Sequence, residues 1–267
     1  MASAKRFPLV AVDVGNSRVK IGVFEHPFAE PLPHAARAAS VGLDWTESDL
    51  AATFPQGPAD HDWWIASVNR PATARLVDWL KQAGVTSVRQ LADTDLPLVV
   101  ELAHPERVGM DRLANAVAVN RIREPGEPAI VIDMGSALTV DLVSAKGAFV
   151  GGAILPGIGT SARALHEFTD LLPLVDVTEP PPALGKSSIE AIRSGLYWGA
   201  VGGVRELVAQ LAPDPLAAQI FLTGGAGPLF AGVLAAESAR PPRFVPHLTL
   251  AGIAIAADGA APPKGSR

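Results

Sequence analysis

Two short segments of the chain place an aspartate, a glycine and a small polar residue at the same spacing. They read "DVGN", which begins at Asp13 and ends at Asn16, and "DMGS", which begins at Asp133 and ends at Ser136. A glycine lets a phosphate group approach the backbone amides, and a side chain such as that of Asn16 donates further hydrogen bonds. The aspartate is suited to hold Mg²⁺, directly or through water, and Lys20 could neutralise phosphate charge. Aspartate and glycine are also ordinary turn residues, but two copies favour a nucleotide-phosphate site.

Each copy lies in the same predicted hairpin. A proline and a β-branched run precede the aspartate, and another apolar run follows the turn, in "PLVAVDVGNSRVKIGVF" (8–24) and again in "PAIVIDMGSALTVDLVS" (128–144). This pattern predicts a strand, a tight turn and a second strand. The copies lie a little under half of the 267 residues apart. We therefore expect an α/β protein of two duplicated domains, whose acid-bearing turns face a nucleotide cleft between them.

The segment "REPGEP" (123–128) is rich in turn residues and marks the expected domain boundary. The first domain should cover residues 1–125 and the second residues 126–258, and the tail 259–267 should be disordered. Between the two hairpins, the sequence predicts strands at 61–68 and 85–91, a helix from Pro71 to Ala83 that stops at Gly84, and another helix within 105–122.

After the second hairpin, the sequence predicts a strand at 148–157, a helix at 161–172, and a strand, glycine turn and helix within 219–230. A long helix should begin at Ser187, because Ser187 and Glu190 have the spacing of a capping box. Glycines recur in this helix at positions 195, 199 and 203. Since each costs helix stability, roughly 1 kcal/mol against alanine, we expect another backbone to approach the helix there.

Composition narrows the chemistry that the chain can perform. It has no cysteine, which excludes a disulfide, a thiolate metal site and a cysteine nucleophile, and its six histidines lie too far apart for a local zinc motif. The net charge is −5 and the basic residues are scattered along the sequence, so no positively charged patch that would bind a nucleic acid is indicated. No run of about 20 apolar residues is present, and the apolar stretch near the start is too short for a signal peptide. We expect a cytoplasmic protein that binds neither nucleic acid nor membrane.

A competing phosphate motif lies at residues 157–162, where "GIGTSA" matches G-x-G-x-x-A and Asp176 follows about 20 residues later. This motif is typical of dinucleotide-binding oxidoreductases, which stay as a weaker alternative. Pro156 and the hairpin context argue against it, and a tight turn with a helix cap is the simpler interpretation. The segment "GKSS" (185–188) is not a P-loop, because Pro180 occupies the position of the earlier glycine.

Several motifs taken together resemble a known family. The series "DVGNSRVK", "VGMDR", "DMGSALTVD", "GGAILPG" and "GKSS" followed by "SGLYWG" is similar, in order and spacing, to the type III pantothenate kinases of bacterial coenzyme A synthesis, over residues 10–225. The resemblance implies two ribonuclease-H-like domains of the actin, hexokinase and chaperone-like ATPase superfamily, with ATP between them. It also implies ATP-dependent phosphorylation of pantothenate to 4'-phosphopantothenate, Mg²⁺ with the ATP, a monovalent cation (K⁺ or NH₄⁺), and a homodimer.

The resemblance further assigns roles to individual residues. Asp111 would be the general base, Asp133 would bind the monovalent cation, and Asp13 would hold Mg²⁺, directly or through water. The residues that would line ATP and its phosphates are Asp13, Val14, Gly15, Asn16, Ser17, Arg18, Val19, Lys20 and Ser136. Those that would bind pantothenate are Gly109, Met110, Asp111, Arg112 and Ser188.

The sequence departs from the family pattern at four of these or neighbouring positions. Ser136 and Ser188 keep the hydroxyl group of the usual threonines, and Met110 replaces a usual alanine. Leu102 stands where a tyrosine commonly lines the substrate site, and leucine cannot donate the hydrogen bond of a tyrosine. A non-catalytic, regulatory relative with the same fold is therefore an alternative, although the aspartates of all three motifs are intact.

Some of the assigned residues also have purely structural interpretations. Asp111 could be a favourable acid in the first turn of a helix, and Arg112 could be the partner in a surface ion pair. Ser188 could be a helix cap, as could Ser187 beside it.

Overall fold

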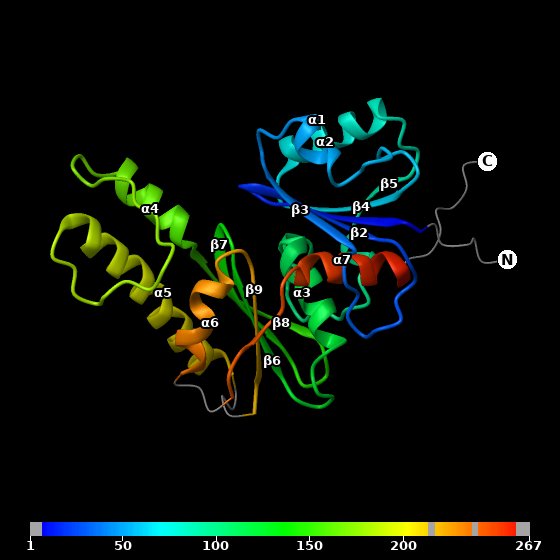
Figure 1. Cartoon of the computed structure of the whole chain (residues 1–267). Coiled ribbons are helices and arrows are strands. Elements are labelled where there is room, and N and C mark those ends of the chain that lie inside the picture. The colour runs from blue at the N-terminus through cyan, green and yellow to red at the C-terminus, as the bar shows by residue number, and fades with distance from the viewer. Residues whose placement is uncertain (1–6, 213–216, 237–239, 260–267) are drawn as a thin grey trace. The chain divides into compact units, whose positions relative to one another are not determined.

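The computed structural model describes residues 7–212, 217–236 and 240–259 (Figure 1). The described chain divides into two compact units. The first contains residues 7–122 together with 247–259, and the second contains residues 123–246. Each unit contains a five-stranded mixed sheet.

The strands of the first unit are β1 (Leu9–Val14), β2 (Arg18–Phe24), β3 (Arg37–Gly42), β4 (Asp62–Ser67) and β5 (Val88–Gln90), in the sheet order β3-β2-β1-β4-β5. Its helices are α1 (Glu47–Ala51), α2 (Arg70–Gln82), α3 (Met110–Asn120) and α7 (Leu248–Gly259), with short 3-10 helices at η1 (Asp93–Asp95) and η2 (Pro105–Arg107). The chain runs antiparallel from β1 through β2 to β3, whereas β4 and β5 continue the sheet in parallel on the other side of β1.

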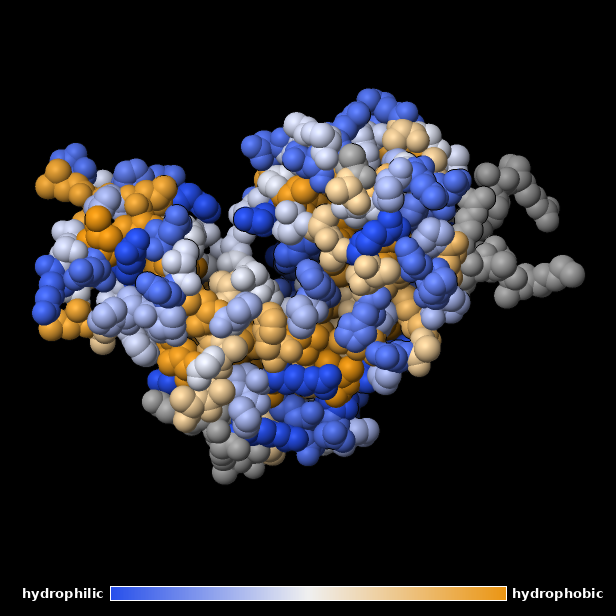
Figure 2. Space-filling view, viewed as in Figure 1, coloured by the Kyte–Doolittle hydropathy of each residue, from blue (hydrophilic) through white to orange (hydrophobic). Residues whose placement is uncertain are grey.

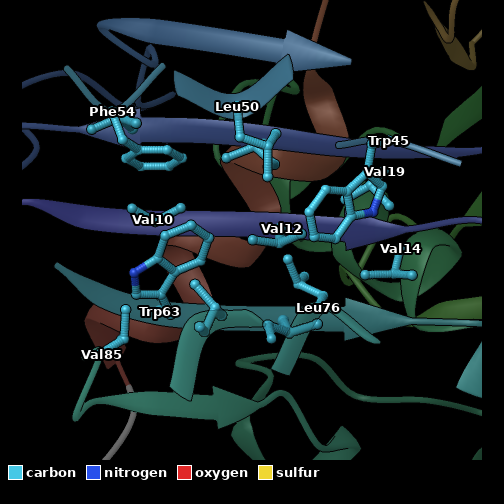
Figure 3. Close-up of a cluster of buried hydrophobic side chains, with 14 residues drawn as sticks. Val10, Val12, Val14, Val19, Trp45, Leu50, Phe54, Trp63, Leu76 and Val85 are labelled. Carbon is cyan, nitrogen blue, oxygen red and sulfur yellow. The ribbon is translucent and has the colours of Figure 1, made fainter. Parts of the chain in front are cut away.

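One face of this sheet carries the core shown in Figure 3. Alternate residues of β1 (Val10, Val12 and Val14) meet apolar side chains of α1 and α2, including Leu50 and Leu76. Helix α2 begins at Arg70, one residue before the predicted start. The Asn69 side chain caps it by accepting a hydrogen bond from the amide of Ala72, and a proline occupies the first turn as predicted.

The opposite face of the first sheet is covered by α7, which contacts β1, β2 and β4. Helices α3 and α7 lie side by side in Figure 1. A Cβ at Gly252 of α7 would lie 1.9 Å from the carbonyl oxygen of Ala114 in α3, so only glycine permits this contact. The buried Thr249 hydroxyl donates to Asn115 Oδ1 at 2.9 Å.

These contacts correct the expected domain limits. The change of unit at residues 122 and 123 lies close to the expected boundary, but the second unit ends at 246 rather than 258, because α7 packs in the first unit. Gly259 is the last residue of α7 and is not part of a tail. The rest of the expected tail, residues 260–267, lies outside the described residues.

The strands of the second unit are β6 (Ala129–Met134), β7 (Ala137–Val143), β8 (Phe149–Pro156), β9 (Gln219–Thr223) and β10 (Arg243–Phe244), in the order β10-β9-β6-β7-β8. Its helices are α4 (Ile158–Glu167), α5 (Ser188–Leu211) and α6 (Gly227–Ala235). As in the first unit, three consecutive strands are antiparallel and the later two pair in parallel beside the first. The predicted duplication is therefore confirmed at the level of topology.

The core of the second unit lies between one face of its sheet and the helices α5 and α6. Tyr197 of α5 stacks on Phe230 of α6 with ring centroids 5.0 Å apart. In the part of the chain that the structure describes, no helix is both long and apolar enough to cross a membrane.

The helices of the second unit differ from the predictions in detail. Helix α4 begins three residues before the predicted start and ends at Glu167, after which the His166 ring nitrogen Nδ1 lies 2.8 Å from the carbonyl oxygen of Leu172 in the returning chain. Helix α5 begins after Ser187 as predicted, and the Ser187 hydroxyl accepts a hydrogen bond from the Glu190 amide. The Glu190 carboxylate, however, accepts from the amide of Lys186 instead of completing the box at Ser187.

The glycine row of α5 does not have the expected backbone neighbour within the described chain. No atom lies within 4 Å of the Cβ positions of Gly195 and Gly199, and Gly203 faces only the side chain of Leu155, at 3.3 Å. The strand β3 and the helices α1 and α7 are not predicted from the sequence pattern.

A buried histidine makes the stability of the first unit depend on pH. His61, which precedes β4, is 9% exposed and packs edge to face against Phe54. Burial lowers the pKa of the His61 imidazole below its usual value, and the charge of Arg37 acts in the same direction, while a hydrogen bond to Pro58 opposes them. Because the pKa is lower in the folded state, the stabilisation is complete above the unfolded-state pKa of about 6.5.

We predict that the unfolding midpoint in urea falls more between pH 8 and pH 5.5 for the wild type than for His61→Leu, which cannot be protonated. Tryptophan fluorescence is the appropriate probe, because the first unit contains Trp45, Trp63, Trp64 and Trp79. His26→Asn, which removes an exposed histidine, should keep the pH dependence of the wild type. Equal slopes for the wild type and His61→Leu would show that His61 does not carry the effect.

Candidate active site

The first acid-bearing turn connects β1 to β2. The Gly15 amide donates to the carbonyl oxygen of Arg18 at 3.0 Å, which closes the turn. Asp13 is directly opposite Lys20 in the β1–β2 ladder, and the Lys20 ammonium lies 3.1 Å from Asp13 Oδ2. Asp13 is 4% exposed, whereas the side chains of Asn16 and Arg18 reach solvent. The turn thus combines a buried, ion-paired carboxylate with polar groups at the surface.

The second acid-bearing turn connects β6 to β7 and is one residue shorter. Here the Gly135 amide donates to the carbonyl oxygen of Ala137 at 3.0 Å. Asp133 pairs directly with Thr139 of β7 on one side and with Thr223 of β9 on the other. Directly paired residues point to the same face of a sheet, so two hydroxyl groups flank the Asp133 carboxylate. Thr139 therefore occupies the place that Lys20 has in the first copy.

Three residues that the sequence analysis does not assign to the site, Gly157, Thr160 and Gly224, support the second turn. The Gly157 amide and the Thr160 hydroxyl both donate to the carbonyl oxygen of Ser136, at 3.0 and 2.7 Å. A Cβ at Gly157 would lie 2.1 Å from the Gly135 carbonyl oxygen, and one at Gly224 would lie 2.4 Å from Asp133 Oδ1. Since Gly224 also has a φ of +90°, both positions require glycine.

The "GIGTSA" segment therefore supports the Ser136 turn from the first turn of α4. It does not have the context of a dinucleotide-binding fingerprint, because β8, which precedes it, is antiparallel to β7 at the edge of the sheet. Gly157 and Gly224 lie in the glycine-containing segments "GGAILPG" and "TGGAG", which mark both as candidates for close backbone contact. The sequence does not indicate which segment of backbone each glycine contacts.

The residues "GMDR" lie at the start of α3, in the same unit as the first turn. Gly109 is the N-cap residue, and Asp111 Oδ1 accepts a hydrogen bond from the Arg112 amide at 2.9 Å. A Cβ at Gly109 would lie 2.5 Å from Asp111 Oδ1 and 3.5 Å from Cγ1 of Val68. The Val68 amide in turn donates to the carbonyl oxygen of Val14 at 3.1 Å. Val68, directly after β4, therefore links the Asp111 segment to the turn after Asp13.

The remaining predicted site residues lie at the ends of helices or in a loop. Met110 and Arg112 are half-buried in the first turn of α3, and Leu102 is half-buried in the loop before η2. Ser188 is the first residue of α5 and is exposed. The loop that leads to it is tied to α5, because the Trp198 indole donates to the Pro181 carbonyl oxygen at 3.1 Å and the Ser194 hydroxyl to that of Ala183 at 2.6 Å.

The structure thus brings two sets of predicted site residues together, each within one unit. The first unit gathers the turn after Asp13 and the segment Gly109–Arg112 around Val68. The second unit gathers Asp133 and Ser136 against the backbone at Gly157 and Gly224.

Comparison with known proteins identifies the family. The family model for type III pantothenate kinases matches residues 9–210. A type III pantothenate kinase of Endomicrobium trichonymphae is 38% identical over 257 residues, which cover 92% of this chain and 97% of the relative. One of Dehalococcoides mccartyi (strain CBDB1) is 35% identical over 260 residues, which cover 92% of this chain and 93% of the relative.

Solved structures show the fold. A conserved putative Baf family transcriptional activator from Campylobacter jejuni has a TM-score of 0.60 at 18% identity, with 94% of this chain and 98% of that chain covered. A putative 2-dehydro-3-deoxygalactonokinase from Sinorhizobium meliloti has a TM-score of 0.57 at 15% identity, with 93% and 98% covered. The fold is that of the actin- and hexokinase-like ATPases, with two similar domains. Because the family match runs from the first strand into α5 and the relatives align along nearly the whole chain, this chain belongs to the type III pantothenate kinase family.

Proposed function

We propose that Asp111 is the general base with which this kinase transfers the γ-phosphoryl group of ATP to the 4'-hydroxyl group of pantothenate. Members of the family phosphorylate pantothenate in coenzyme A synthesis. The observation that supports Asp111 is its place beside Val68, which also holds the phosphate turn after Asp13. A base must lie within hydrogen-bond reach of the hydroxyl group that it deprotonates, and the phosphate that is attacked must lie next to that hydroxyl.

In the proposed reaction, the hydroxyl oxygen forms a bond to the γ-phosphorus while the bond from this phosphorus to the bridging oxygen of ADP breaks. The hydroxyl proton passes to the Asp111 carboxylate. Because the transition state is loose, positioning and charge neutralisation contribute most of the rate, and backbone amides of the turn between Val14 and Lys20 would hold the phosphates. Since ATP is the donor, we place this reaction in the cytoplasm.

We further propose that Asp13 holds the Mg²⁺ that accompanies ATP, through a bound water. The nearly buried carboxylate fits this role, because Lys20 already occupies one of its oxygens and Mg²⁺ keeps several of its waters. Bound there, Mg²⁺ would neutralise charge that develops on the transferring phosphoryl group. Lys20 holds the Asp13 carboxylate in place and adds positive charge beside the turn.

For Asp133 we propose a monovalent cation, K⁺ or NH₄⁺. The fit rests on the donor set: a carboxylate flanked by the hydroxyl groups of Thr139 and Thr223 offers oxygen ligands alone, which suit a hard cation. Among the described residues, the Thr139 hydroxyl is buried without a hydrogen-bond partner, so a ligand role would satisfy it. Ser136, on the same turn, would contact ATP.

Pantothenate would bind to the segment Gly109–Arg112 and to Ser188. Ser188 is exposed and keeps the hydroxyl group that this role requires. Leu102 can contribute only apolar contact, so Leu102→Tyr would restore the hydrogen-bonding side chain usual in the family.

We propose that the enzyme is a homodimer. Figure 2 shows hydrophobic side chains gathered on the surface of the second unit where α4 and α5 lie. The large exposed apolar residues of this region are Phe168, Leu171, Leu174, Leu184, Ile189 and Trp198. Exposed apolar patches of this kind are typical of protein interfaces. The uncovered glycines of α5 would let a second subunit approach this helix closely.

Asp111→Asn should lower kcat by about 10² to 10⁴, because asparagine keeps the size of the side chain but cannot accept the proton. ATP binding should stay near that of the wild type, as measured by titration calorimetry. Asp78→Asn, which changes an exposed aspartate of α2, is the control and should be fully active. A kcat within threefold of the wild type, under conditions in which chemistry limits turnover, would leave Asp111 as a helix-start acid.

Gly109→Ala should lower kcat by roughly tenfold to a hundredfold, since an ångström of misplacement of a catalytic group has an effect of this size. The backbone at Gly109 (φ −59°, ψ 131°) accepts alanine, but the new methyl group would displace the Asp111 carboxylate. Circular dichroism should show an intact fold. Gly232→Ala in α6, where a methyl group meets nothing within 4 Å, should keep wild-type kcat. A fully active Gly109→Ala enzyme would contradict the positioning of Asp111.

Removal of K⁺ should strongly lower the rate of ADP release by the wild type. Asp133→Ala should have a low rate that does not depend on the K⁺ concentration. The measurement is the rate of ADP release against K⁺ concentration, with Na⁺ used to hold the ionic strength constant. Strong activation by K⁺ that survives in Asp133→Ala would place the cation elsewhere.

Light scattering across a dilution series should report twice the mass of one subunit. Leu171→Glu together with Ile189→Glu should shift the protein toward the single-subunit mass, because these substitutions place charges in the exposed apolar region of α4 and α5. A single-subunit mass for the wild type at every concentration would rule out the dimer.

A further inference from the structure

Val68 is a partly exposed apolar residue that lies between two polar segments of the proposed site, the turn after Asp13 and the start of α3. It follows β4, whose central residues are buried, yet 39% of Val68 is exposed. An exposed valine is common on protein surfaces and means little by its exposure alone. Its neighbours are what distinguish Val68, because they are the residues proposed to bind phosphate and to deprotonate the substrate.

The backbone at Val68 is held from both sides. Its amide donates to the carbonyl oxygen of Val14 at 3.1 Å, directly before the phosphate turn. The next residue, Asn69, donates from its amide to the Ser67 hydroxyl at 2.9 Å, and its side chain caps α2 through the amide of Ala72 at 3.1 Å. The Val68 side chain therefore projects from a fixed support, which is what a residue needs to discriminate between ligands.

The Val68 side chain lies beside the proposed base. Its Cγ1 methyl group and Asp111 Oδ1 both lie close to the position that a Cβ at Gly109 would take, at 3.5 and 2.5 Å from it, so the two atoms are no more than about 6 Å apart. Because Gly109 has no side chain, the space close to both the valine methyl group and the carboxylate oxygen is not filled by a methyl group of its own. A molecule that is hydrogen-bonded to Asp111 can therefore also reach the Val68 methyl group.

Pantothenate has an apolar group at the matching place. The carbon that bears its 4'-hydroxyl group is bonded to a quaternary carbon with two methyl groups, so these methyls lie within a few ångströms of the nucleophilic oxygen. We propose that Val68 contacts this dimethyl group and makes the enzyme selective for it. This inference rests on the proposed role of Asp111, because that role fixes where the hydroxyl group lies.

The contact predicts a preference that depends on the substrate methyl groups. One methylene group in an apolar pocket is worth about tenfold to 200-fold in kcat/KM. Val68 supplies one wall of such a pocket, so we expect about tenfold from this side chain. The preference should appear in kcat/KM for the acceptor substrate, with the KM for ATP unchanged.

The test compares pantothenate with its analogue in which hydrogens replace the two methyl groups. Val68→Thr keeps the shape of valine and replaces one methyl group by a hydroxyl group. We expect it to lower kcat/KM for pantothenate about tenfold and to change that for the analogue less than twofold. Val68→Ala should show the same selectivity, which guards against an effect specific to the new hydroxyl group. Val150→Thr, at a valine of β8 that is 36% exposed, should behave as the wild type.

The outcomes separate this inference from the proposed function. An equal loss for both substrates would mean that Val68 acts only on the local structure, and unchanged kinetics would mean that it does not touch the substrate; either result overturns the inference. If the wild type fails to phosphorylate pantothenate, or if Asp111→Asn is fully active, the proposed function or the proposed base fails instead, independently of Val68.

Discussion

A carboxylate buried at the end of a central strand is the constraint on which the rest of the first unit depends. Asp13 is 4% exposed and lies in β1, which has a hydrogen-bonded strand on either side. An ionised carboxylate at such a place needs a compensating partner, and Lys20 supplies it across the ladder. That pairing requires the register in which Asp13 is opposite Lys20, and the register requires a tight turn with the Gly15 amide bonded to Arg18. The polar tip of the turn then lies in solvent, where it can meet an anion.

The second unit repeats the hairpin but changes its chemistry by losing one residue from the turn. The shorter turn places Thr139, an oxygen donor, where the first copy has an ammonium group. It also lets other segments close in on the backbone, since the Gly157 amide and the Thr160 hydroxyl reach the Ser136 carbonyl oxygen. The two copies thus share the strand–turn–strand backbone and differ in the side chain opposite the aspartate, which is a lysine in the first copy and a threonine in the second. The loss of one turn residue is thus enough to exchange a cationic partner of the aspartate for a neutral oxygen donor.

Much of this structure could be predicted because its signals are local. The β-branched runs around Asp13 and Asp133 specified both hairpins, and Ser187 specified the start of α5. Helix α7 could not be recognised, because Leu248–Ala257 are all buried and a helix that is apolar on every side has no periodic pattern. In the site, the two aspartates were visible as a repeated motif. The positions of Val68 and Gly224 in the site could not be predicted, because each is defined by a contact with a segment that is distant in sequence.

The return of α7 to the first unit has a consequence for synthesis of the protein. In sequence, the second unit is an insertion within the first, because residues 123–246 separate β1–α3 from α7. A chain that leaves the ribosome from its N-terminus can complete the inserted unit while the surrounding unit still lacks the helix that covers one face of its sheet. During that interval Ala114 and the apolar surface of β1 and β2 have no Gly252 helix against them. The segment that is translated first therefore acquires its full packing only after α7 has been translated.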